Sequence, residues 1–323
     1  MQVHVWRLSS EGKLERITED AGIHGGSAGG DVVVVASASM EHDGIRTKVR
    51  RGSDERAQIQ SLAETPLVRP NVSFLRAGDR QIRTAVLLPR DHEPLASLPV
   101  LLDPYGGPHF QRVVLARNAF LESQWFADQG FAVVVADGRG TPGRGVAWEK
   151  EIHLDIAGPV LEDQVEALAG AAQEHPELDL TKVAIRGWSF GGYLAALAVL
   201  RRPDVFHAAI AGAPVTDERL YDTHYTERYL GHPVEHPEAY SNNSLLDDAP
   251  RLERPLMLIH GLADDNVVVA HTLRLSRALL EAGRPHRVLP LAGITHMTPA
   301  VTEHLLLLQL DFLREALGLP DSA

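Results

Sequence analysis

Residues 182–193 read Lys-Val-Ala-Ile-Arg-Gly-Trp-Ser-Phe-Gly-Gly-Tyr, and an Ala- and Leu-rich run follows as far as Leu200. The apolar run before Gly187 is typical of a strand, and the run after Gly191 is typical of a helix. Between them, Gly-x-Ser-x-Gly marks a tight turn that lifts a serine hydroxyl clear of the backbone, near the positive end of the helix. An ordinary glycine-rich turn is the alternative. The strand-to-helix context leads us to predict that Ser189 is a nucleophile.

Strands and helices alternate along the chain on both sides of this turn. The expected strands are residues 81–89, 98–102, 131–136, 182–187, 205–211, 255–260 and 287–291. The expected helices are residues 119–129, 161–172, 192–200, 272–282 and 302–317. Such alternation predicts an α/β fold with a doubly wound, mostly parallel sheet, whose functional groups collect at the carboxyl ends of the strands. Ser189, Asp264 and His296 each follow an expected strand.

The N-terminal part of the chain has a different pattern. Residues 3–6 alternate, glycines mark turns, and residues 31–37 form a β-branched run. A whole propeller needs several blades of about 40–45 residues, so this part suits one or two blades or a small sheet. We expect residues 1–77 to be a propeller remnant or small β-sheet segment with its linker, and residues 78–323 to be a catalytic domain.

Composition limits the classes of partner. The chain has 323 residues, a formal net charge of −12 and no cysteine. This charge argues against nucleic acid as a partner, and the missing cysteines exclude disulfides and a cysteine nucleophile. Residues 1–6 lack a basic region followed by an apolar core, and residues 305–308, the longest apolar run near the C-terminus, are far too short to span a bilayer. We expect a cytoplasmic protein without a signal peptide or membrane partner.

A glycine motif offers a competing function. Residues 138–143 read Gly-Arg-Gly-Thr-Pro-Gly and match the dinucleotide-binding fingerprint letter for letter. In that fingerprint a helix opens within the glycines, so that its N-terminus faces the pyrophosphate. Here Pro142 interrupts, and the next convincing helix is expected roughly fifteen residues later. We set dinucleotide binding aside and expect Arg139 to brace this loop through an ion pair with a nearby Asp or Glu.

A serine nucleophile needs a base and an acid that orients the base. α/β-Hydrolases place them in the chain order Ser, acid, His. Asp264 and Asp265 both follow the strand at residues 255–260, and spacing alone does not separate them. His296 lies between the last strand and the last helix, and this position selects it among the sixteen histidines.

The oxyanion of an acyl-transfer reaction needs two donors. One is expected to be the backbone N–H of Phe190, directly after the nucleophile. The other is expected from the loop at residues 103–108, where the phenol of Tyr105 is the best side-chain candidate. A packing aromatic explains Tyr105 equally well at this point.

Five segments of the chain resemble the prolyl oligopeptidase family, specifically its dipeptidyl peptidase IV branch. They are residues 103–108 (DPYGGP), 137–140 (DGRG), 187–193 (GWSFGGY), 221–229 (YDTHYTERY) and 260–267 (HGLADDNV). The resemblance implies an α/β-hydrolase fold, Asp264 as the acid, Tyr105 as the second oxyanion donor, and no cofactor or metal.

The resemblance also implies a substrate pocket. Val215, Tyr221, Tyr225, Val267 and Phe190 would line an apolar S1 pocket suited to proline, whose ring has no N–H to satisfy. By the same resemblance, Asn266 would hydrogen-bond the substrate carbonyl.

Two features depart from the family pattern. Glu218 stands where the family has an aromatic S1 residue, and a carboxylate there would weaken proline binding or admit a basic group. The propeller that clamps the substrate's N-terminus in the family is reduced here to residues 1–77, at most. Either the chain is a fragment of a longer enzyme, or it is a shortened protein with different access rules.

We therefore expect a serine peptidase that works through an acyl-enzyme and releases N-terminal dipeptides after Pro or Ala. A promiscuous serine esterase is the alternative, and both take a small peptide or ester. A non-catalytic scaffold of the same fold is disfavoured because Ser, Asp and His are all present. The leucines at residues 305–308 are explained by core packing, with a homodimer face as the alternative.

Overall fold

The computed structural model describes residues 1–93 and 96–320; residues 94–95 and 321–323 of the expected catalytic domain lie outside the described part. The strands are β1 (Trp6–Leu8), β2 (Leu14–Arg16), β3 (Ile23–Gly29), β4 (Val32–Ala38), β5 (Arg46–Arg51), β6 (Asp54–Ile59), β7 (Val72–Ala77), β8 (Ile82–Leu87), β9 (Leu98–Leu102), β10 (Ala132–Asp137), β11 (Leu178–Trp188), β12 (Ala208–Gly212), β13 (Leu256–Gly261) and β14 (Arg287–Leu291). The α-helices are α1 (Leu121–Asp128), α2 (Val146–Lys150), α3 (Gly158–Glu174), α4 (Phe190–Arg201), α5 (Thr223–Leu230), α6 (Pro237–Asn242), α7 (Ala270–Glu281) and α8 (Thr302–Leu317). Short 3₁₀ turns are η1 (Arg117–Phe120), η2 (Glu218–Leu220) and η3 (Ala249–Arg251).

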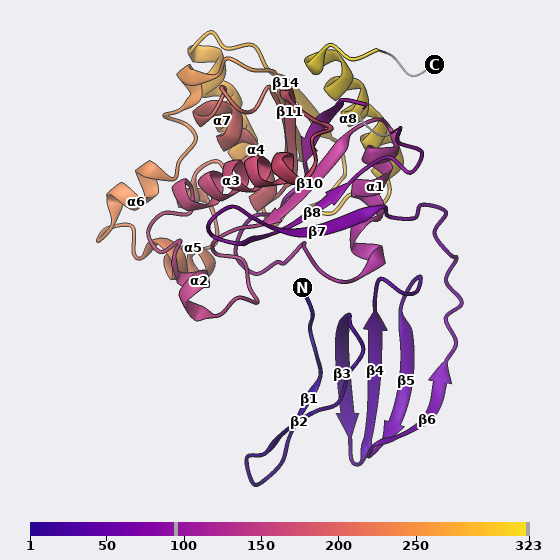
Figure 1. The fold of residues 1–323 in the computed structure, drawn as a ribbon. Coiled ribbons are helices and arrows are strands. Elements are labelled where there is room, and N and C mark those ends of the chain that lie inside the picture. Colours follow the sequence, from indigo (N-terminus) through magenta and orange to yellow (C-terminus); the bar gives the residue numbers. More distant parts are fainter. Residues whose placement is uncertain (94–95, 321–323) are drawn as a thin grey trace.

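The larger sheet has eight strands in the order β14-β13-β12-β11-β9-β10-β8-β7. The six strands from β9 to β14 are parallel, and β8 and β7 continue the sheet in antiparallel fashion. Figure 1 shows helices on both faces of this sheet. The doubly wound, mostly parallel α/β-hydrolase sheet expected from the sequence is confirmed.

Successive residues of the central strands enter two separate cores, one on each face of the sheet. Val183 and Ile185 of β11 pack with residues of α3, α4 and α7. Ala184, between them, packs with residues of α1 and α8, and Trp188 contacts that same core. Since side chains alternate along a strand, Arg186 also belongs on the α1/α8 face.

The N-terminal segment forms a four-stranded antiparallel sheet, β3-β4-β5-β6, and a separate β1–β2 hairpin. Figure 1 shows this sheet below the larger one, joined to it by an extended segment that leads from β6 to β7. Arg117 connects the two parts: Nη1 donates to Asp43 at 2.7 Å and Nη2 to the Met40 carbonyl at 2.6 Å.

One difference from the sequence expectation concerns the domain boundary. β7 pairs with β8 in the large sheet, and Phe74 packs against the core on the α1/α8 face. The boundary expected between residues 77 and 78 falls inside this hairpin. Residues 72–77 therefore belong to the large sheet and not to the N-terminal segment.

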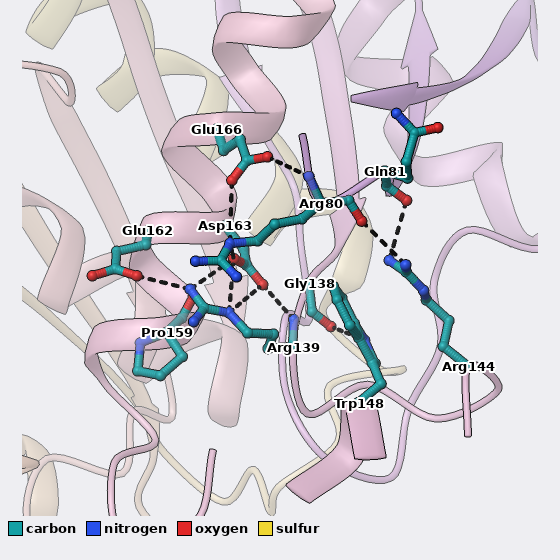
Figure 2. Close-up of polar contacts among 10 residues, drawn as sticks. All are labelled: Arg80, Gln81, Gly138, Arg139, Arg144, Trp148, Pro159, Glu162, Asp163 and Glu166. Atoms are coloured by element: carbon teal, nitrogen blue, oxygen red, sulfur yellow. Dashed lines mark hydrogen bonds and ion pairs between the residues drawn. The ribbon is translucent and has the colours of Figure 1, made fainter. Parts of the chain in front are cut away.

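The loop at residues 138–148 is braced from inside the protein. Arg139 Nη2 lies 2.9 Å from Asp163 Oδ1 of α3 and 2.8 Å from Glu162 Oε2, as Figure 2 shows. The ion pair expected for Arg139 is confirmed. The expected absence of a nearby helix is wrong, because the five-residue α2 begins at Val146, directly after Gly145 with its φ of 98°.

The glycine motif of this loop is engaged in contacts inside the protein. The backbone N–H of Arg139 donates to Asp163, and the carbonyl of Gly138 accepts from Trp148 Nε1 at 2.9 Å. A Cβ on Gly138 would lie 2.6 Å from the Cβ of Asp163. The glycines thus let the loop approach α3 closely, and at least one N–H group of the loop already donates a hydrogen bond within the protein.

Candidate active site

The turn between β11 and α4 holds Ser189 in a strained conformation, with φ 58° and ψ −118°. Only a few per cent of residues other than glycine have a positive φ, and such strain persists where the surroundings impose it. A Cβ on Gly187 would lie 2.2 Å from the Gly191 carbonyl oxygen, so the turn can close only with glycine there. The Ser189 N–H donates to the Gly212 carbonyl at 2.9 Å and fixes the turn on β12. This geometry is that of a nucleophile elbow.

The loops after β13 and β14 bring a carboxylate and a histidine together. His296 Nδ1 lies 2.8 Å from Asp264 Oδ2, and the Asp264 side chain is fully buried. Asp264 Oδ1 accepts from the N–H groups of Asn266 at 3.0 Å and Val267 at 2.9 Å. Because the carboxylate accepts from Nδ1, Nε2 is left to act as a base. Asp265, which spacing did not separate from Asp264, is exposed to solvent.

A second histidine, His260, hydrogen-bonds the same loop from inside the protein. It is buried, its Nε2 donates to the Val267 carbonyl at 2.7 Å, and its Nδ1 lies 2.7 Å from Thr272 Oγ1. Burial lowers the pKa of His260, so the ring stays neutral. The only sequence feature that points to this role of His260 is an apolar strand that ends in a histidine.

Trp188 is the other functional residue that the sequence analysis missed. Its indole Nε1 donates to the His296 carbonyl at 2.9 Å. The residue before the nucleophile thus holds the histidine loop, which lies over a hundred positions further along the chain. This link joins the last residue of β11 to the loop after β14, so no local pattern reveals it.

One cavity of about 550 Å³ joins these groups at the carboxyl edge of the sheet. Ser189, His296, Tyr105, Tyr221 and Asn266 all line it. Among the described residues no hydrogen bond joins Ser189 to His296, a contact that often forms only when substrate binds. The sequence-based candidates for nucleophile, base and one oxyanion donor therefore meet in a single cavity.

The two oxyanion candidates follow two neighbouring strands of the sheet, β9 and β11. Phe190 is the first residue of α4, where helix geometry leaves the N–H without an intrahelical acceptor. Tyr105 follows β9, and its ring packs 5.9 Å from Phe190 and 5.4 Å from Phe110. Burial, with Tyr221 and Tyr229 nearby, raises the pKa of Tyr105 to about 12. The phenol therefore keeps its proton at neutral pH and can donate.

The residues expected to line an apolar pocket lie beside this cavity, but not all of them open into it. Tyr221 and Asn266 line it. The ring of Tyr225 packs edge to face against that of Tyr221, with 5.3 Å between the ring centres, while Val215 is 4% and Val267 0% exposed. None of these three residues lines the cavity in the described part of the chain.

Glu218 is buried at the start of η2 and accepts from Thr226 Oγ1 at 3.0 Å. Burial, with Asp217 nearby, raises the pKa of Glu218 to about 7, against an opposing effect of Thr226. Its charge is therefore partly lost at neutral pH. The penalty expected for a carboxylate beside an apolar pocket is correspondingly reduced.

Comparisons with known proteins agree with this geometry. Dipeptidyl peptidase 8 of Mus musculus is 39% identical over 240 residues, which are 71% of this chain and 27% of that protein. Prolyl endopeptidase FAP of Bos taurus is 29% identical over 293 residues, 88% of this chain and 38% of that protein. The crystal structure of Porphyromonas gingivalis dipeptidyl peptidase 4 matches with a TM-score of 0.88 and 26% identity, over 97% of this chain and 46% of that one.

The chain thus spans well under half the length of these curated relatives. The sequence pattern of the prolyl oligopeptidase family matches residues 117–320, which include the elbow, the Asp264 loop and the His296 loop. A strained serine, a buried aspartate paired with a histidine, and this match lead to one conclusion: the chain belongs to the prolyl oligopeptidase family.

Proposed function

We propose that this protein is a serine hydrolase that cleaves peptide bonds through an acyl-enzyme. The observation that carries the proposal is the cavity in which the strained Ser189 and the Asp264-bound His296 meet. In this scheme Ser189 Oγ attacks the substrate carbonyl carbon while His296 Nε2 accepts its proton. Asp264 keeps the imidazole in the required tautomer and stabilises the imidazolium.

The tetrahedral intermediate places its negative oxygen between Tyr105 and the Phe190 N–H, which stabilise it. His296 then returns the proton to the leaving amine as the C–N bond breaks. Water, activated by the same histidine, hydrolyses the acyl-enzyme and restores Ser189.

For the substrate we propose release of N-terminal dipeptides after Pro or Ala. Support comes from the names of the relatives and from the aromatic wall that Tyr221 and Tyr225 form beside Asn266. A partly protonated Glu218 is compatible with an apolar residue at P1, the substrate position before the cleaved bond. Cytoplasmic location and a homodimer remain predictions. Among the helices of the described residues, none is both long and apolar enough to cross a bilayer.

A promiscuous esterase is the second candidate, and the N-terminal part of the structure favours it. Only one four-stranded sheet precedes the large sheet in the described residues, and it has the form of a single propeller blade. In the described part of the chain, no residue of this sheet lines the active-site cavity. Within the described residues, the groups that would select a substrate therefore all come from the large sheet and its loops, which fit a small ester as well as a peptide.

The test compares hydrolysis of an Ala-Pro anilide with that of a short-chain nitrophenyl ester, using Ser189→Ala as the blank. Turnover of both substrates that is lost in Ser189→Ala supports the peptidase. Ester turnover alone supports the second candidate. Persistent stoichiometric labelling of Ser189→Ala by a fluorophosphonate would rule out this serine as the nucleophile.

A further inference from the structure

The active-site cavity has two chemically different halves on either side of Ser189. Tyr221 and Asn266 mark the half in which the acyl part of the substrate is proposed to bind. The other half lies on the α1/α8 face of the sheet, where Arg112, Glu122 and Arg186 line it together with residues of α8. We call this second part the α1/α8 half. If the acyl part fills the first half, the leaving group is expected to enter the α1/α8 half.

Charged groups in the α1/α8 half form one connected cluster. Asp103 Oδ2 accepts from Arg112 Nη2 at 2.9 Å and from Ser123 Oγ at 2.6 Å. Arg186 Nη1 lies 3.7 Å from Asp103 Oδ1, and Arg186 Nη2 donates to Glu122 Oε1 at 2.5 Å. The Asp103 side chain is 6% exposed, whereas the Glu122 side chain is 47% exposed. The Asp103 carboxylate is thus held inside the protein, whereas the Glu122 side chain can turn into solvent and release Arg186.

Both arginines keep unused donors. Arg112 Nε, Arg186 Nε and Arg186 Nη1 are buried without a hydrogen-bond acceptor in the described part of the chain. Leaving a buried donor unsatisfied is unfavourable, so such groups call for an explanation. Arg186 is held in place by the ring of Phe126, 4.5 Å from its guanidinium carbon. Its position is therefore set in advance of any ligand.

We propose that the α1/α8 half binds a carboxylate carried by a short leaving group. The inference rests on the proposed peptidase function and adds a preference on the far side of the cleaved bond. A guanidinium presents its N–H groups as a planar fork that matches a carboxylate. In the free protein Glu122 accepts a hydrogen bond from Arg186 Nη2, and a substrate carboxylate takes its place. The favoured substrates are tripeptides and tetrapeptides with a free C-terminus, or peptides with an acidic residue directly after the cleaved bond.

The experiment compares matched peptides that differ only in this carboxylate. Ala-Pro-Ala and Ala-Pro-Ala-Ala are each tested as the free acid and as the C-terminal amide. A third pair, the amides of Ala-Pro-Glu and Ala-Pro-Gln, tests a side-chain carboxylate as the source. We expect kcat/KM to be about ten- to a hundredfold higher for the acid member of at least one pair.

Two substitutions should move this acid-to-amide ratio in opposite directions. Arg186→Met should bring the ratio close to one, because the fork is lost while side-chain volume is largely kept. Glu122→Gln should raise the ratio, because it removes a competing and repelling carboxylate from a half-exposed position. Arg277→Met, an exposed substitution on α7 that breaks only the pair with Glu281, should keep the wild-type ratio.

The acid-to-amide ratio of kcat/KM is measured within each variant, so a general loss of activity does not change it. Ratios near one for all three pairs in the wild type would overturn the carboxylate proposal, while Ser189-dependent turnover of the anilide would keep the proposed function intact. A ratio that falls in both Arg186→Met and Glu122→Gln would also overturn it, since a purely structural ion pair behaves in that way. Absence of Ser189-dependent turnover of any substrate would overturn both proposals.

Discussion

Glu218 experiences two opposing influences at the scale of a single residue. Burial and the neighbouring Asp217 favour the neutral acid, and the Thr226 hydroxyl favours the carboxylate. The first influence is larger, so the pKa rises from 4.5 to about 7. Because the folded protein holds this proton more tightly than the unfolded chain, the free energy of unfolding should fall as the pH rises through this interval.

This linkage predicts a pH-dependent gain in stability for Glu218→Gln. Below pH 4.5 the wild-type carboxyl is protonated in both states, so the substitution should change little. As the pH rises to 8, the wild type should lose on the order of 3 kcal/mol relative to the variant. Urea denaturation at pH 4.5, 6 and 8 measures this difference. A constant difference across the three pH values would show that folding does not raise the pKa of Glu218.

Tyr105 carries the second prediction at this scale. Tyr105→Phe keeps the ring that packs between Phe110 and Phe190 but removes the donor. We expect kcat for the ester to fall about 10²–10³-fold, the usual cost of losing one oxyanion donor, with a smaller change in KM. Tyr240→Phe is the matched control, because its hydroxyl donates to the Gly231 carbonyl outside the cavity. Equal kcat values for the two variants would exclude Tyr105 from the oxyanion site.

At the scale of elements, the strongly patterned parts of the chain were predictable. The bounds of β14 and α8 agree with the sequence expectation, and the elbow between β11 and α4 was found from its glycines. β7 was assigned to a linker because it lies at the edge of the sheet, next to a proline-containing, charged stretch. α2, with five residues, is too short to show a helical period.

The candidate site, like the fold, is only partly predictable from the sequence. The Gly-x-Ser-x-Gly turn identifies Ser189 as a candidate, and the position after the last strand identifies His296, because functional loops follow the strands of a parallel sheet. Burial, which no sequence window records, separates Asp264 from Asp265. The Arg186–Glu122 pair joins β11 to α1, two segments whose relative placement depends on the whole sheet.

The braced loop at residues 138–148 supplies a prediction at this scale. Asp163 is buried, and burial raises its pKa against the opposing effect of Arg139. Arg139→Met leaves this carboxylate without its main partner, which should lower the free energy of unfolding by about 3–5 kcal/mol. Arg90→Met breaks an exposed pair with Asp128 and should cost no more than about 1 kcal/mol. Similar urea midpoints for both variants would contradict a structural role for the buried pair.

At the scale of the whole molecule, Arg117 is one of the residues that hold the N-terminal sheet against the hydrolase part. Arg117 binds Asp43 and the Met40 carbonyl, and its own N–H donates to the Ser39 carbonyl at 3.0 Å. A cavity of about 750 Å³ lies between the two parts, so they are not packed tightly everywhere. The N-terminal sheet therefore depends on a few polar contacts for its position.

We predict that Arg117→Ala loosens the N-terminal sheet without unfolding the large one. Amide hydrogen exchange should become at least tenfold faster in β3 and β4, and should stay near the wild-type rate in β9–β13. This contrast is expected because local opening needs less free energy than global unfolding. Uniform acceleration over both sheets would indicate that the two parts unfold as one unit.

The indole hydrogen bond from Trp188 to the His296 carbonyl has a consequence for motif searches and for enzyme engineering. The position between glycine and serine in Gly-x-Ser-x-Gly is conventionally written as free. In this protein it holds the loop of His296, the proposed general base, so a transplanted elbow with alanine at that position would keep its serine and lose the hydrogen bond that anchors its histidine. A sequence can therefore match all of Gly-x-Ser-x-Gly and still lack the hydrogen bond that positions the loop of its histidine.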